Sequence, residues 1–96
     1  MATPLPICYL NGEYLPLTAA RISPLDRGFL FADSVYEVLA VFAKRPYRFI
    51  EHFARLDRSL HEIRMTSPLN HREWLAIVQE LTARNACENF YIYVQV

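Results

Sequence analysis

Glycine is scarce in this chain of 96 residues, which contains Gly12 and Gly28 alone. Two glycines are too few for a collagen-like sequence or for a phosphate loop of the G-x-G-x-x-G kind. Cysteine is equally rare, and Cys8 and Cys87 form neither a disulfide framework nor a metal-ligand spacing. No N-x-S/T sequon occurs. These absences fit a protein of a reducing compartment.

The chain also lacks net charge and long apolar runs. Ten basic and ten acidic residues balance, which argues against a nucleic-acid partner, because phosphate neutralisation supplies most of that affinity. No run approaches the roughly 20 apolar residues of a membrane span. The first basic residue is Arg21, so no signal peptide is recognised. We expect one soluble, cytoplasmic globular domain, for which 53% hydrophobic residues provide a core.

The N-terminal half has the patterns of β-structure. Asn11 and Gly12 favour a tight turn between strands at 7–10 and 13–15. Residues 23–33 are expected to form a loop.

The segment 34–42 alternates as a strand does. One face carries Val35, Leu39 and Val41, and the other carries Tyr36, Val38, Ala40 and Phe42. Apolar residues on both faces favour a strand that is covered on both sides. Residues 44–46 are expected to turn the chain into a second strand at 47–50.

The period then becomes helical. A first helix is predicted by the apolar stripe of Phe53, Leu56, Leu60 and Ile63, and it should end before Pro68. Asn70 and Glu73 are a plausible capping pair for a second helix that runs to about Asn85. Its apolar face is formed by Trp74, Leu75, Val78 and Leu81.

Residues 90–96 are rich in β-formers and are expected to form a last strand. A strand of this kind with nothing after it would be an aggregation-prone edge, so we expect residues 1–96 to be the N-terminal domain of a longer protein. The fold class predicted is α+β, with a mostly antiparallel sheet and two helices packed on one face.

Most candidate reactive groups have ordinary interpretations. His52 and His61 are nine positions apart, on opposite faces of a helix, and His71 lies beyond Pro68, so no metal site is expected. Lys44 is the single lysine and falls in a predicted turn, where a desolvated reactive lysine is unusual.

The polar side of the first helix is more informative. His52, Arg55 and Ser59 fall within about 60° of one another on a helical wheel. Arg55 could hold a phosphate in bidentate fashion, or it could form a surface ion pair with Glu51 one turn earlier. Glu37, on a largely apolar strand face, needs a partner or solvent, and Tyr36 is interpreted as a core tyrosine. The residues alone favour the surface pair for Arg55.

Three segments follow one another in an order and spacing that resemble class IV (fold type IV) aminotransferases. They are 26–38 (DRGFLFADSVYEV), 51–56 (EHFARL) and 62–64 (EIR). The resemblance extends from the opening hairpin to the terminal strand and is strongest for the D-amino acid branch. It implies the small N-terminal domain of a homodimeric enzyme that uses pyridoxal 5′-phosphate.

The resemblance also implies roles for individual residues. Arg55 would bind the cofactor phosphate, and Tyr36 would hydrogen-bond the substrate carboxylate. Val38 and Phe31 would line the pocket for the substrate side chain, and His52 would lie beneath the carboxylate site. Tyr36 favours the D-amino acid branch, because other branches often have phenylalanine there.

Two departures limit the resemblance. Ala32 and Ser34 stand where the family usually has glycine. The second domain, which carries the Schiff-base lysine, is absent from this chain, and Lys44 does not match that position. No catalytic residue is therefore assigned, and the isolated chain is expected to be inactive.

The complete protein is expected to transfer the amino group of a D-amino acid, such as D-alanine, to a 2-oxo acid. The alternatives are a branched-chain aminotransferase, an aminodeoxychorismate lyase or a truncated module without chemistry.

Overall fold

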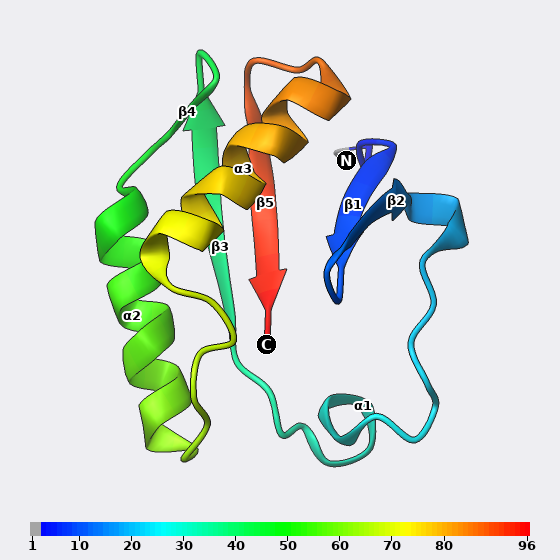
Figure 1. Ribbon diagram of the computed structural model, residues 1–96, viewed down its shortest axis with the longest axis vertical. Coiled ribbons are helices and arrows are strands. Elements are labelled where there is room, and N and C mark those ends of the chain that lie inside the picture. Colours follow the sequence, from blue (N-terminus) through cyan, green and yellow to red (C-terminus); the bar gives the residue numbers. More distant parts are fainter. Residues whose placement is uncertain (1–2) are drawn as a thin grey trace.

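The computed structural model describes residues 3–96, which form two small antiparallel sheets and two long helices (Figure 1). In chain order the elements are β1 (Ile7–Leu10), β2 (Glu13–Pro16), a 3₁₀ turn (Leu17–Ala19), α1 (Arg27–Phe31), β3 (Tyr36–Phe42), β4 (Arg45–Pro46), α2 (Phe49–Glu62), α3 (His71–Asn85) and β5 (Phe90–Gln95). The predicted α+β class is confirmed, although the strands form two separate sheets.

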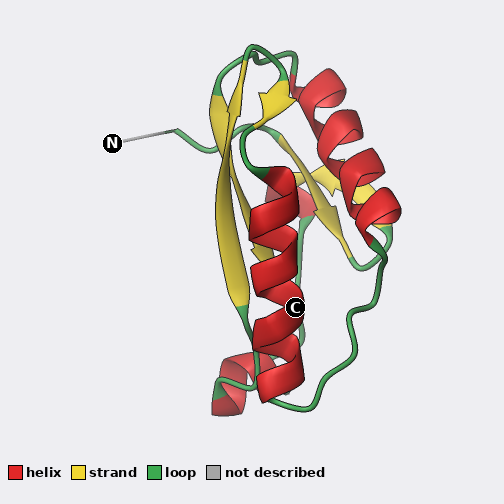
Figure 2. Ribbon diagram, turned by 90° about the vertical axis from the view of Figure 1, so that its left-hand side faces the viewer, coloured by secondary structure: helices red, strands yellow, loops and turns green. Residues whose placement is uncertain are grey.

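The larger sheet has the strand order β4-β3-β5, with both pairings antiparallel. Glu37, Leu39 and Val41 of β3 are buried, whereas Tyr36 and Val38, which alternate with them, are exposed. Figure 2 shows why: both long helices lie on one side of this sheet. The prediction that β3 is covered on both faces is therefore wrong for the described residues, because no element of 3–96 packs on the Tyr36 side.

Two helices complete the core, and both were predicted: α3 ends at Asn85 as expected, whereas α2 begins at Phe49, inside the strand predicted at 47–50. α2 buries Phe53, Leu56 and Leu60 against β3. The buried stripe ends at Leu60, three positions before Ile63, because α2 ends at Glu62 and its C-cap residue Ile63 is exposed. α3 begins with a capping box, in which the Asn70 side chain accepts from the Glu73 amide and the Glu73 side chain accepts from the Asn70 amide.

The second strand predicted at 47–50 is wrong. Ala43 and Lys44 both have positive φ, 50° and 65°, and this tight turn pairs Phe42 directly with Arg45. β4 is therefore only two residues long. Arg48 adopts a left-handed conformation and α2 begins at the next residue.

The predicted hairpin is confirmed, but it is not part of the larger sheet. β1 and β2 pair with each other around Asn11 and Gly12, whose φ of 94° suits glycine. The hairpin is fixed to α3, because Asn85 accepts from the Ile7 amide and donates to the Ile7 carbonyl at 2.9 and 3.0 Å.

The loop expected at 23–33 contains a short helix. Asp26 caps α1 by accepting from the Gly28 amide. After Phe31, Ala32 ends the helix in a left-handed conformation with φ 57°. α1 lies below the larger sheet in Figure 1, at the end of a long excursion from the hairpin.

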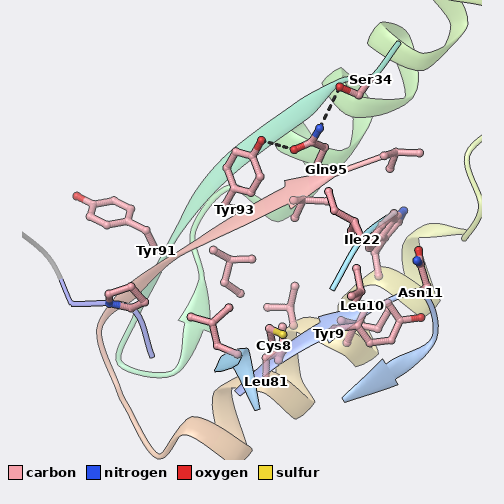
Figure 3. A pocket seen from close by; sticks show the side chains of 18 of the residues that line it. Cys8, Tyr9, Leu10, Asn11, Ile22, Ser34, Leu81, Tyr91, Tyr93 and Gln95 are labelled. Atoms are coloured by element: carbon pink, nitrogen blue, oxygen red, sulfur yellow. Dashed lines mark hydrogen bonds between the residues drawn. The ribbon is translucent and has the colours of Figure 1, made fainter. Parts of the chain in front are cut away.

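A hollow of about 2210 Å³ separates β5 from the hairpin (Figure 3). Its walls come from β1, from β5 and from α3, including Leu81. No helix within residues 3–96 combines the length and the apolar character that crossing a bilayer requires.

Candidate functional site

A cluster of three polar residues lies where β3 meets the first turns of α2. His52 and Arg55 are three positions apart on α2, so they project from one side of the helix. Glu37 lies on the inward face of β3, in the row that continues with Leu39 and Val41. Its side chain is 5% exposed. The packing of α2 on β3 brings these three polar residues together.

Every contact in this cluster is a short hydrogen bond. Arg55 binds Glu37 through one edge of its guanidinium: Nε donates to Oε2 at 2.7 Å, and Nη2 donates to Oε1 at 2.8 Å. His52 approaches the same carboxylate, with 2.9 Å between Nδ1 and Oε1. An ionised carboxylate accepts only, so Nδ1 is the protonated nitrogen in this contact.

The electrostatics follow from this geometry. The hydrogen bond from Arg55 is the main cause that holds the pKa of Glu37 below its ordinary value, with His52 contributing and burial opposing. In turn, the bond to Glu37 raises the pKa of Arg55 above its ordinary value. Glu37 is therefore an anion near neutral pH, and it neutralises part of the charge on α2.

Arg55 retains donors for a second anion. A guanidinium has five N–H groups, of which two point to Glu37, so three remain. The side chain of Arg55 is 57% exposed. It also lines a hollow of about 300 Å³, together with Arg48, Glu51, His52 and Arg58. Three arginines around one small hollow favour an anionic ligand such as a phosphate.

Tyr36 and Val38 lie on the opposite face of β3 from Glu37. Tyr36 is 62% exposed and stacks on Tyr93 of β5, with ring centroids 5.6 Å apart and planes at 21°. The interpretation of Tyr36 as a core residue is wrong, because this face of the sheet is bare in the described residues. Val38 is also exposed on this face, so the two residues form one surface, as the sequence predicted.

A polar chain holds the outer end of this surface. The Tyr93 hydroxyl donates to Gln95 Oε1 at 2.6 Å, and Gln95 Nε2 donates to the Ser34 hydroxyl at 3.0 Å (Figure 3). Ser34, which departs from the family pattern, is thereby tied to β5. This series of hydrogen bonds orients the ring of Tyr93, on which Tyr36 stacks.

Phe31 is not brought into the same cluster. It lies at the end of α1, 62% exposed, and its ring contacts the Arg27 guanidinium at 5.1 Å. The five residues predicted for the site therefore occupy three places. Arg55 and His52 lie on α2, Tyr36 and Val38 lie on the bare face of the sheet, and Phe31 lies on α1.

The predicted surface pair of Arg55 with Glu51 is wrong, because the carboxylate that Arg55 binds is Glu37. Glu37 is the residue that the sequence analysis did not assign to the site. The available signal was an acidic side chain in an otherwise apolar row of a strand, which needs a partner or solvent. Which cation would reach it depends on how α2 crosses β3, and this is not visible in the sequence.

Within residues 3–96 no group of three histidine, cysteine or acidic side chains could hold a metal ion. Lys44 is exposed in the turn between β3 and β4.

Comparison with solved structures assigns the fold to aminotransferases. The branched-chain amino acid aminotransferase of T.th., solved with pyridoxamine 5′-phosphate, superposes with a TM-score of 0.87 at 26% identity, covering 98% of this chain and 32% of that one. Residues 34–96 match the family described as amino-transferase class IV. The chain belongs to the class IV aminotransferase family, and the resemblance noted from the sequence is confirmed.

Curated relatives give the same family with another substrate name. The D-alanine aminotransferase of Staphylococcus haemolyticus is 33% identical over 87 residues, which are 91% of this chain and 31% of that protein. The D-alanine aminotransferase of Listeria monocytogenes is 30% identical over 87 residues, again 91% of this chain. This chain thus spans about 31% of the length of the first of these relatives.

Proposed function

We propose that this chain forms part of a pyridoxal 5′-phosphate-dependent transaminase, in which Arg55 binds the phosphate of the cofactor. The observation that carries the proposal is the guanidinium of Arg55, which is fixed on one edge by Glu37 and has three N–H donors left beside a hollow lined by arginines. Membership of the class IV family supports the cofactor, as does the pyridoxamine 5′-phosphate named for the T.th. structure.

The residues present fit a phosphate group. Phosphate is recognised by planar, bidentate donors more specifically than by point charges, and the outer edge of Arg55 offers such a pair. The cofactor itself supplies the electron sink for the amino-group chemistry. The residues of this chain would bind the cofactor phosphate and orient the substrate. They supply no desolvated reactive lysine, because the single lysine lies in an exposed turn. We accordingly expect the isolated chain to have no transaminase activity.

We further propose a D-amino acid, D-alanine-like, as amino donor and a 2-oxo acid as acceptor, in a homodimer. The D-alanine aminotransferases that align over 91% of the chain support this substrate. On the bare face of β3, Tyr36 presents a hydroxyl that would donate to the substrate carboxylate, with Val38 and Phe31 beside the substrate side chain. His52 would support the carboxylate site from below.

A second candidate is a branched-chain amino acid as donor. The high TM-score to the T.th. branched-chain enzyme favours it. The substrate test compares kcat/KM for D-alanine with that for L-leucine and L-isoleucine, using 2-oxoglutarate as acceptor and the product of the complete reading frame. Turnover of D-alanine supports the first candidate. Exclusive turnover of the branched L-amino acids would replace it by the second.

The cofactor role is tested by Arg55→Ala in that same complete protein. Loss of hydrogen bonds to a charged phosphate should weaken the affinity of the apoprotein for pyridoxal 5′-phosphate roughly 10- to 150-fold, measured by titration of the cofactor absorbance. Arg84→Ala is the matched control, since Arg84 is similarly exposed and paired with a glutamate on α3. Equal affinities for the two variants would contradict the role of Arg55.

A further inference from the structure

We propose that Glu37 is a positioning residue for the anion site: it holds the Arg55 guanidinium in the orientation that receives the cofactor phosphate. This inference rests on the proposed function. Its basis is a carboxylate that is 5% exposed and that receives three short contacts, two from Arg55 and one from His52.

Packing alone does not explain a carboxylate at this position. The row of Glu37 continues with Leu39 and Val41, which are 1% and 0% exposed, and α2 is already anchored there by fully buried Phe53 and Leu56. An apolar side chain would complete this row. Replacing a buried ion pair by apolar residues is often neutral or stabilising, so stability gives no reason for the charge.

What the carboxylate supplies is a fixed guanidinium. Arg55 is more than half exposed, and a long exposed side chain samples many rotamers unless its head group is held. Two parallel hydrogen bonds to Glu37 set both the position and the plane of the fork. The remaining N–H groups then point away from Glu37, and the ordering cost of binding a phosphate has already been met.

The same carboxylate sets the orientation of His52. Because Nδ1 donates to Glu37 Oε1, Nε2 lies on the far side of the ring and is free of this contact. One anion thus orients two neighbouring side chains of α2. It also offsets the positive charge that Arg48, Arg55 and Arg58 place around the small hollow.

The test uses the apoprotein from the complete reading frame and equilibrium binding of pyridoxal 5′-phosphate. Glu37→Gln keeps the size of the side chain but removes the charge and one acceptor. We expect affinity to fall roughly 3- to 10-fold, the scale of ordering one long side chain. Glu80→Gln is the matched control, because it removes the carboxylate partner of Arg84 at 2.8 Å; it should leave affinity unchanged.

A double-mutant cycle separates positioning from a general structural role. If Glu37 acts through Arg55, Glu37→Gln has no further effect on affinity in the Arg55→Ala background. The ³¹P resonance of the bound cofactor should also shift in Glu37→Gln and not in Glu80→Gln. Independent, additive losses of affinity in the cycle would overturn the inference, as would an unshifted phosphate resonance.

Two further outcomes are distinguishable. If Arg55→Ala weakens binding and Glu37→Gln does not, the inference fails and the proposed role of Arg55 stands. If Arg55→Ala itself leaves binding unchanged, the proposed role fails first. Should Glu37→Gln not fold, Glu37→Asp replaces it: this variant keeps the charge but is one methylene too short for both bonds, so a reduced affinity is expected and wild-type affinity would contradict the inference.

Discussion

Phe53 joins the two long helices, and replacing it by alanine should remove a large part of the stability of the chain. The side chain is 0% exposed. The centroid of its ring lies 4.5 Å from the ring centroid of Phe49 and 5.3 Å from that of Trp74. Phe→Ala substitutions in cores lower the free energy of unfolding by about 3–5 kcal/mol. Because Phe53 has two aromatic neighbours, we expect its loss in the upper half of that range. The total free energy of unfolding of a domain of 96 residues is about 5–14 kcal/mol.

The assay is urea unfolding of the 96-residue chain followed by the fluorescence of Trp74, its single tryptophan, which reports on the same core. Phe53→Ala should lower the urea midpoint by roughly 2 M or more, or unfold the chain without urea. Phe29→Ala is the matched control, since Phe29 is 69% exposed and should change the free energy of unfolding by no more than about 0.5 kcal/mol. Equal midpoints for the two variants would refute the packing argument.

Three further predictions concern single contacts. Asn70→Ala removes the capping box of α3 and should lower the free energy of unfolding by about 1 kcal/mol in urea titrations; an unchanged midpoint would contradict the cap. Arg55 holds the pKa of Glu37 below its ordinary value, so the Glu37 carboxyl takes up a proton at higher pH in the unfolded chain than in the folded chain. The free energy of unfolding that the ionised Glu37 contributes is therefore present above about pH 4.3 and is lost as the pH falls. Glu37→Gln should accordingly flatten the decline of unfolding free energy below that pH, and an unaltered slope would contradict the pairing. Asn85→Ala removes the acceptor of the Ile7 amide and should speed its hydrogen exchange, measured by NMR, by roughly tenfold or more; unchanged protection would show that the hairpin is held elsewhere.

The elements that the sequence predicted correctly are those whose signals are local. Asn11 and Gly12 specify their turn by the left-handed backbone they tolerate. Asn70 and Glu73 specify the start of α3 by bonding to each other's backbone. In both cases the residues that carry the signal also make the contact, so the pattern and the structure coincide.

The elements that the sequence missed depend on conformations or partners that residue type does not indicate. The turn before β4 places Ala43 and Lys44 at positive φ, where glycine or asparagine would be the usual signal. The hairpin forms its own sheet and is held to α3 by Asn85, 78 positions from Ile7. Likewise, apolar residues on both faces of β3 indicated two covered faces, but the described chain supplies helices for one.

In the candidate site, too, the sequence predicted local features and missed a long-range contact. For this reason Arg55 could be identified from the sequence, but its partner could not. The one-turn spacing of His52 and Arg55 is a property of α2 alone, so the helical wheel places them side by side. Glu51, one turn before Arg55, was then the nearest carboxylate by the same local geometry. In the structure Arg55 turns instead to Glu37, 18 positions away, because the buried carboxylate requires a cation more strongly than an exposed one does. A helical pattern in the sequence indicates the carboxylate that is nearest along the helix. In the folded chain the pairing depends on which carboxylate would cost more free energy if it were buried without a partner. For this site the cost of an unpaired buried charge decides, and it joins the carboxylate of β3 to the guanidinium of Arg55 on α2.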